Sequence, residues 1–136
     1  MNIEEFLDQT DRVFNDEGIP CDFGCSQHSI PTMIEYVKNN LSPYPYTVVS
    51  GWKWIDIDVS KEIKEDLKKY GFKPCALFAR KVIDAERMRR FNSVRTTLLQ
   101  GFHNNCIFLT QNTAYILCGP GKRVSINSRV FSSLMG

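Results

Sequence analysis

The chain lacks acidic residues after Glu86, although its 136 residues include fifteen Asp and Glu in all. Residues 1–60 carry ten acidic and three basic side chains, a net charge of −7. Residues 61–136 carry five acidic and fourteen basic ones, a net charge of +9, so the whole chain is close to neutral at +2. This separation predicts either an anionic partner for the basic part or two parts that fold together and neutralise each other.

The chain also lacks a long apolar run. A helix needs roughly twenty apolar residues to cross a bilayer, and no stretch approaches that length, so we expect no membrane span. The N-terminal sequence MNIEEFLDQTD is acidic and amphipathic, whereas a secretory signal has a basic start and an apolar core. Five cysteines are an odd number, which disfavours a closed set of disulfides and suits a reducing compartment. These features predict a cytoplasmic protein.

The composition is that of an ordinary globular protein, with 43% hydrophobic and 24% charged residues. A chain of this length fits one domain that buries roughly two-thirds of its unfolded surface. No repeat, linker or low-complexity segment divides it. We therefore expect residues 1–136 to form a single domain.

The spacing of apolar residues predicts four helices, which cover 3–14, 30–41, 61–70 and 128–134. Asn2 and Ser29 stand where caps of the first two helices are expected. The third helix follows Ser60 and ends at Gly71, a residue type that favours the position after a helix. We expect its apolar residues to face the core; they are Ile63, Leu67 and Tyr70.

Alternation of apolar and polar residues predicts strands at 46–50 and 52–58, with Gly51 as a bulge or bend between them. Further strand-like segments are 75–83, 93–100, 106–110 and 113–118. A tight hairpin at 111–112 places Phe108 opposite Tyr115. Because helices gather early and strands late, we expect an α+β fold. Its largely antiparallel sheet of about five to six strands would end in a C-terminal meander. Two N-terminal helices, one central helix and a short C-terminal helix would pack with that sheet.

The stretch CDFGCSQH places Cys21, Cys25 and His28 within eight residues and raises the question of a metal site. A structural zinc needs four Cys or His ligands, usually in two short-spaced pairs, and the spacing here matches no common module. No orienting partner or oxyanion-hole pattern accompanies the thiols, so a Cys–His nucleophile is not supported either. We therefore expect an ordinary loop, with no metal, no cofactor and no catalytic residue.

Period two places Trp52, Trp54, Asp56 and Asp58 on one face of a strand. Paired carboxylates beside aromatic rings suit a sugar ring or a cation. The simpler interpretation is that the tryptophans belong to the core and that Asp58 only precedes a helix. We keep these four residues as a candidate secondary site.

A basic run and a basic turn form the main candidate surface for a partner, made of Arg87, Arg89, Arg90, Arg95, Lys122 and Arg123. Guanidinium groups suit phosphate or carboxylate groups. The turn at 119–123, GPGKR, is not a phosphate-binding loop because no Ser or Thr follows the lysine. No established nucleic-acid-binding motif accompanies the basic run.

Three segments carry a family resemblance: W-x-W-x-D-x-D-V at 52–59, S-V-R-T-T at 93–97 and T-Q-N-T-A-Y-I-L-x-G-x-G at 110–121. In these the chain resembles a small bacterial domain of unknown function that occurs in proteobacterial genomes and their prophages. Its specific points are Trp52, Trp54, Asp56, Arg95, Thr96, Asn112, Thr113, Tyr115, Gly119 and Gly121. The resemblance implies no activity, cofactor or catalytic residue, and it suggests a small accessory protein that acts on a host or phage macromolecule.

Two functions compete at this point. The first is a non-enzymatic accessory protein, associated with a prophage or mobile element, that binds a protein partner. The alternative is a nucleic-acid-associated protein that uses the basic segment 80–95. A small hydrolase built on Asp56 and Asp58 is a distant third. We favour the protein partner because the acidic part of the chain would repel a long polyanion.

Overall fold

The structure, a computed structural model, describes residues 2–15, 18–87 and 93–135. Its helices in these ranges are α1 (Ile3–Phe14), α2 (Ile30–Asn40), α3 (Lys61–Lys69) and α4 (Ser128–Met135). Its strands are β1 (Ile19–Cys21), β2 (Tyr46–Asp58), β3 (Cys75–Ala85), β4 (Val94–Arg95), β5 (Gly101–His103), β6 (Ile107–Leu109), β7 (Ala114–Leu117) and β8 (Gly121–Asn127). The expected α+β class and the four helices are confirmed.

The sheet has eight strands in the described ranges, more than the five to six expected. The strands that the sequence did not predict are β1, β5 and β8, and β1 ends at Cys21, the first residue of the stretch that was expected to be a loop. β1 and β5 have three residues each, too few for a readable alternation, so sequence periodicity cannot detect them. β8 has seven residues, and it was missed because its first residues were interpreted as a basic turn. In contrast, the expected separate strands 46–50 and 52–58 form the single long strand β2.

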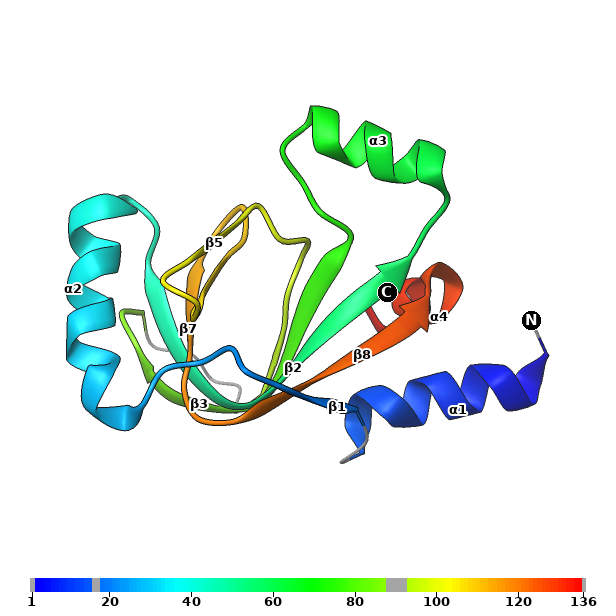
Figure 1. Cartoon of the computed structure of the whole chain (residues 1–136), viewed down its shortest axis with the longest axis horizontal. Helices are drawn as coiled ribbons and strands as arrows, with labels where there is room; N and C mark the ends of the chain where they lie inside the picture. The colour runs from blue at the N-terminus through cyan, green and yellow to red at the C-terminus, as the bar shows by residue number, and fades with distance from the viewer. Residues whose placement is uncertain (1, 16–17, 88–92, 136) are drawn as a thin grey trace.

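β2 is the axis of the sheet, and it has different partners along its two edges (Figure 1). β3 pairs antiparallel with β2 along one edge, while β7 and then β8 follow one another, both parallel to β2, along the other. The sheet is therefore largely but not wholly antiparallel. The expected meander exists only as β5, β6 and β7, in which Phe108 lies opposite Tyr115 as predicted.

Gly51 bends β2 at the level where its second edge changes from β7 to β8. The residue has a φ of +59°, a conformation that glycine adopts without strain. Immediately after it, the indole Nε1 of Trp52 donates a hydrogen bond to the carbonyl of Gly119, at 3.0 Å. A Cβ atom on Gly121 would lie only 2.2 Å from atoms of the Trp52 ring. The ring therefore packs directly on the backbone that joins β7 to β8.

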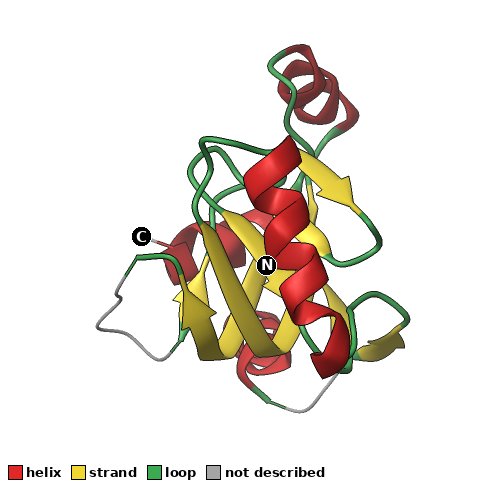
Figure 2. Cartoon of the chain, turned by 90° about the vertical axis from the view of Figure 1, so that its left-hand side faces the viewer, coloured by secondary structure: helices red, strands yellow, loops and turns green. Residues whose placement is uncertain are grey.

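The two faces of the sheet bury separate apolar clusters. One face, here the tryptophan face, carries Trp52 and Trp54 together with Leu77 and Phe108. The opposite face, here the helix face, is covered by α1 and α4 on one half, where Ile55 is buried. On its other half it is covered by α2 (Figures 1 and 2). Period-two side-chain alternation along β2 accounts for this division.

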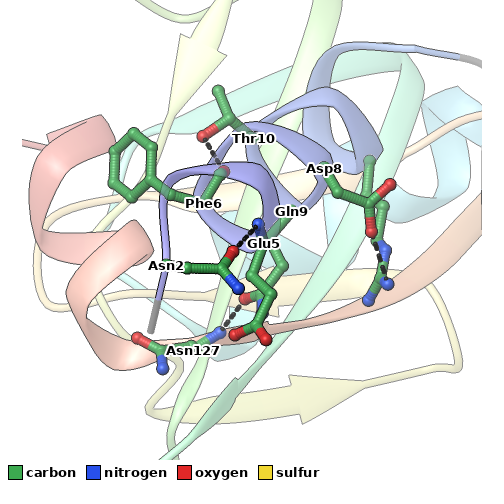
Figure 3. A network of polar contacts seen from close by, with 8 residues as sticks. Asn2, Glu5, Phe6, Asp8, Gln9, Thr10 and Asn127 are labelled. Carbon is green, nitrogen blue, oxygen red and sulfur yellow. Dashed lines mark hydrogen bonds and ion pairs between the residues drawn. The ribbon is translucent and has the colours of Figure 1, made fainter.

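Hydrogen bonds cap the start of α1 and join the helix to the end of β8 (Figure 3). The side chain of Asn2 accepts a hydrogen bond from the backbone N–H of Glu5, at 2.8 Å, as expected for the cap. The side-chain oxygen of Gln9 accepts one from the backbone N–H of Asn127, at the end of β8, at 2.6 Å. These contacts hold the acidic N-terminal helix against the basic C-terminal part of the chain.

α3 stands apart from the rest of the molecule, at the top of both views (Figures 1 and 2). None of its nine residues is buried. The expectation that its apolar residues face the core is wrong, because Ile63 is 49% exposed and Tyr70 is 77% exposed. No helix in the described ranges has the length and apolar character that crossing a bilayer requires.

Candidate functional site

α3 keeps its helical form through contacts at its own ends. The Ser60 hydroxyl accepts a hydrogen bond from the backbone N–H of Ile63, at 3.2 Å. At the other end the N–H of Phe72 donates to the carbonyl of Leu67, and the N–H of Gly71 donates to the carbonyl of Lys68. This pair of bonds is the Schellman motif, which commonly brings the first and last of its residues into apolar contact. Leu67 is half-buried for this local reason, and not because α3 packs on the core.

Helical spacing divides the surface of α3 into three sectors. Ile63, Leu67 and Tyr70 follow one another at steps of four and three residues and form an apolar ridge. Lys64 and Lys68, one turn apart, form a basic sector that adjoins the ridge. The third sector is acidic, with Glu62, Glu65 and Asp66.

A pocket of about 590 Å³ lies between α3 and the ends of β2, β3 and β8. We call it the α3 pocket. Its apolar lining comes from Ile57, Val59, Phe72, Pro74 and Cys75. Three exposed lysines, Lys64, Lys68 and Lys73, also line it. The basic sector of α3 therefore faces the pocket, whereas its acidic sector does not contribute to the lining.

Asp56 lines the α3 pocket, but its carboxylate is already paired with a guanidinium group. Its carboxylate accepts two hydrogen bonds from the guanidinium of Arg123, from Nε at 2.5 Å and from Nη2 at 2.9 Å. The indole N–H of Trp54 and the thiol of Cys75 also donate to Oδ1, at 3.3 and 3.5 Å. Because Arg123 also lies over the Trp54 ring, at 5.3 Å, this cluster joins β2, β3 and β8.

The electrostatics of this cluster do not favour acid–base or thiol chemistry. Burial, followed by the charge of Asp56, raises the pKa of Cys75 to about 11, so the thiol is neutral at physiological pH. The hydrogen bond to Asp56 is the main cause that raises the pKa of Arg123, whose guanidinium is a permanent cation in any case. The chemistry available here is that of a structural ion pair.

The other residues of the candidate secondary site fall into two groups. Trp52 is 2% exposed and Trp54 is 4% exposed, so both rings belong to the core of the tryptophan face. Phe23, Phe102 and Phe108 surround the Trp54 ring at centroid distances of 5.0–5.1 Å. Asp58 is exposed and lines the α3 pocket. The structure therefore places Asp56 and Asp58 at the α3 pocket and both tryptophans in the core, and of the four only Asp58 presents an unpaired side chain to solvent.

The candidate basic surface is dispersed over the molecule. Arg95, Phe78, Lys53 and Lys122 lie in one row across β4, β3, β2 and β8, and this row shares the helix face. Arg123 lies on the opposite face, in the ion pair with Asp56. Arg95 donates to the carbonyl of Leu134 and lies over the ring of Phe14.

Of the rest of this basic set, the structure describes only Arg87. Arg87 is exposed beyond the end of β3, and Arg89 and Arg90 lie outside the described residues. The four described residues of the set therefore do not converge on one patch.

The loop CDFGCSQH separates its three candidate ligands. Cys21 ends β1 and packs against the tryptophan-face core, while His28 lies exposed in a short 3-10 helix, Gln27–Ser29. Cys25 forms an isolated parallel bridge with Cys118, and Cys106 is fully buried. Burial raises the pKa of Cys25, and it raises that of Cys106 to about 12. In the described ranges no group of three or more His, Cys, Asp or Glu is arranged to hold a metal ion.

Sequence reasoning missed Lys64, Lys68 and Lys73 as candidate site residues. The signal that could have found them is the composition of the third helix, KEIKEDLKK, in which only two of nine residues are apolar. A helix that packs on a core usually carries a wider apolar stripe. The narrow stripe indicates a helix that buries little within its own chain.

The geometry thus defines a class: an α+β protein with one bent eight-stranded sheet, a projecting helix and no metal-binding group of His, Cys, Asp or Glu among the described residues. The chain belongs to the family described as "Domain of unknown function (DUF6957)", whose sequence profile matches residues 22–133. The expected resemblance to a domain of unknown function is confirmed, and the match leaves out α1 and β1. Neither a curated protein nor a solved structure matches the chain.

Proposed function

We propose that this protein is a non-enzymatic interaction module that binds another protein through the apolar ridge of α3. The single observation that supports this most is that α3 projects from the molecule with none of its residues buried, although it carries Ile63, Leu67 and Tyr70 in line. Large apolar side chains gathered on a projecting element are typical of an interaction site.

The short length of α3 supports the same proposal. Isolated helices of fewer than about 12–15 residues are marginal in water, and helices in proteins obtain most of their stability from packing. α3 has nine residues, good caps at both ends and no packing partner that buries it among the described residues. A partner that covers the ridge would supply the missing packing.

A protein suits α3 better than a nucleic acid does. Glu62, Glu65 and Asp66 lie on the same helix as the lysines, and a polyphosphate backbone alongside α3 would meet these carboxylates. An apolar ridge also has little to offer to phosphates, whereas it fits the apolar side chains of another polypeptide.

The family resemblance suggests where the protein would meet its partner. A small accessory protein of a prophage or mobile element would meet its partner in the bacterial cytoplasm, where that partner is a host or phage protein. The five free cysteines suit such a reducing compartment.

Site-specific photo-crosslinking in cells tests this function. A photoreactive amino acid replaces Ile63 or Tyr70, and a matched control carries it at Ile19, which is 75% exposed. Ile19 belongs to β1, a strand that lies well away from α3 (Figure 1). We expect Ile63 and Tyr70, but not Ile19, to form an adduct with one other protein, identified by mass spectrometry. Adducts from all three positions, or an adduct only with a second copy of the chain, would contradict the proposal.

The identified partner is then purified and its affinity measured directly. The double variant Ile63→Ser, Tyr70→Ser should weaken binding at least about tenfold, as loss of interface anchors does. Its stability should stay within about 0.5 kcal/mol of the wild type because both side chains are exposed. The control variant Ile19→Ser should bind normally. Unchanged affinity of the double variant would show that α3 is not the docking element.

A further inference from the structure

The α3 pocket has a chemistry of its own that extends the proposed function. We infer that the segment of the partner protein that docks on α3 is acidic, places its carboxylates on Lys64, Lys68 and Lys73, and inserts an apolar side chain into the α3 pocket. This inference rests on the proposed function, since it specifies what the partner of α3 carries.

The charge of the pocket supports an anionic ligand. In the described part of the chain, no ion pair joins any of the three lysines to a carboxylate. Of the two carboxylates that line the pocket, Asp56 is held by both arms of Arg123. Asp58 alone remains to balance three ammonium groups, so the pocket carries an excess of positive charge that an acidic segment would neutralise.

The spacing of the lysines limits where the carboxylates lie. Lys64 and Lys68 are four residues apart on one side of α3, a rise of about 6 Å along the helix. Acidic residues one helical turn apart on a partner helix match this distance. Lys73 comes from the segment that follows α3 and lines the same pocket, where it can receive a third carboxylate.

The shape of the pocket supports an apolar anchor between these charges. Phe72, Pro74, Ile57 and Val59 contribute apolar lining, and a volume of about 590 Å³ is ample for one large side chain. Buried apolar anchors surrounded by polar contacts are the usual source of affinity in protein interfaces. A purely ionic site would not need this apolar lining.

Continuity with the ridge indicates a polypeptide in preference to a free organic acid. Leu67 belongs to the ridge, and its carbonyl accepts the N–H of Phe72, which lines the pocket. The ridge and the pocket are thus adjacent parts of one surface, and a small acid would fill only one of them. A chain segment several residues long can contact both.

Titration of the isotopically labelled full-length protein with a synthetic peptide tests the inference by NMR. The probe is acetyl-Glu-Ala-Leu-Phe-Glu-amide, which has two carboxylates four residues apart and apolar side chains between them. Matched peptides carry Gln or Lys in place of both Glu residues. We expect the acidic peptide to shift the amide signals of residues 57–59 and 72–75, and the Lys peptide to shift none of them.

The lysines themselves are tested with two double variants on one helix. Lys64→Gln with Lys68→Gln should weaken the acidic peptide about fivefold or more, because two exposed ion pairs are lost. Lys61→Gln with Lys69→Gln removes the same charge from residues that do not line the pocket and should leave the affinity within about twofold. Equal weakening by both pairs would mean that only net charge matters and would overturn the inference.

Two competitors identify the class of ligand. If 4-phenylbutyrate binds as tightly as the acidic peptide, the pocket serves a free organic acid; if a single-stranded oligonucleotide displaces the peptide, it serves a nucleic acid. Either result overturns the inference. Because the peptide titration needs no natural partner, its failure is distinguishable from failure of the crosslinking experiment, which tests docking on α3 itself.

Discussion

Trp52 packs so closely on Gly121 that no side chain can be placed at that glycine without moving the ring. The Cβ of an alanine there would lie 2.2 Å from the Trp52 ring, far inside van der Waals contact. Gly119, two residues earlier, has the opposite character, since it has a φ of +74° and no atom within 4 Å of an added Cβ. The two glycines therefore separate steric crowding from backbone conformation at one bend.

We predict that Gly121→Ala destabilises the protein by about 3 kcal/mol, at the upper end of the usual cost of overpacking a core. Gly119→Ala should cost about 1–2 kcal/mol, because only the left-handed backbone conformation is penalised. Urea unfolding of both variants measures the difference. The double variant Gly121→Ala, Trp52→Leu should be less destabilised than the sum of its single changes, as expected for residues in contact. Strict additivity would show that the ring and the glycine are energetically independent.

Buried thiols make the stability of the fold depend on alkaline pH. Burial is the main cause that raises the pKa of Cys106 to about 12 and that of Cys75 to about 11, from ordinary values near 9. In the unfolded chain the thiols ionise first, so a rise in pH above about 9 favours the unfolded state. The contribution is complete below that pH and is lost progressively as the pH approaches 11–12.

We therefore predict that the free energy of unfolding falls between pH 9 and pH 11 and that Cys106→Ala makes this fall less steep. Chemical unfolding at a series of pH values measures both slopes. Cys21→Ala is the matched control, because Cys21 is only half-buried. A slope that Cys106→Ala leaves unchanged would mean that other groups cause the alkaline loss of stability.

At the scale of elements, the C-terminal end of α1 is held by cations from the sheet. The Nζ of Lys53, a residue only 6% exposed, donates to the carbonyl of Arg12 at 2.6 Å and also to that of Asn15. Arg80 donates to the carbonyl of Phe14. The last carbonyls of a helix carry partial negative charge, so these contacts stabilise the docked helix.

We predict that Lys53→Met, which keeps the length of the side chain, costs about 1.5–3 kcal/mol, the range for hydrogen bonds that involve a charged group. Amide hydrogen exchange should then rise selectively in α1. Arg12→Ala is the control: in the described part of the chain its side chain forms only an exposed pair with Asp8, at 2.8 Å, so the change should cost less than about 1 kcal/mol. Equal effects of the two changes would contradict the role of Lys53 at the helix end.

Local signals predicted the elements that are stabilised locally. The Asn2 cap, the bounds 3–14 of α1 and the hairpin that pairs Phe108 with Tyr115 all follow from neighbouring residues. The parallel pairing of β2 with β7 and β8 was not predicted, because it joins residues more than sixty positions apart and leaves no local trace. The α3 pocket was missed for the same reason, since α3 encloses it with β2 and β8 only in the folded chain.

At the scale of the whole molecule, the fold brings the acidic and basic parts of the chain into contact, and one of the three ion pairs in the described residues joins them. The acidic helix α1 packs on the basic C-terminal part, where the side chain of Gln9 accepts a hydrogen bond from the backbone of Asn127. Asp56, from the acidic part, pairs with Arg123, from the basic part. Two parts that neutralise each other were one of the two outcomes that the sequence left open, and the described contacts favour it.

This arrangement leads to the last prediction, which concerns nucleic acid. Arg95 and Lys122 share the helix face with α1, while Arg123 lies on the opposite face and is already paired, so one duplex cannot engage them together. Binding to mixed-sequence duplex DNA at physiological salt should therefore be no tighter than about 100 μM, the weak limit of non-specific binding.

The salt dependence separates the two alternatives more sharply than the affinity does. If the run that contains Arg87, Arg89 and Arg90 contacted three phosphates, log K against log salt would have a slope of about −2.7, at about −0.9 for each phosphate. Replacing all three by Ala would then remove nearly all of that slope. We expect instead a shallow slope that the triple variant leaves unchanged. If the run did bind DNA, the triple variant would lose affinity for DNA at every salt concentration below physiological. Micromolar binding to DNA that the triple variant abolishes would contradict the proposed role of α3 and would show that the basic segment is the binding site. The charges of α3 are intact in that variant, so they could not explain the loss.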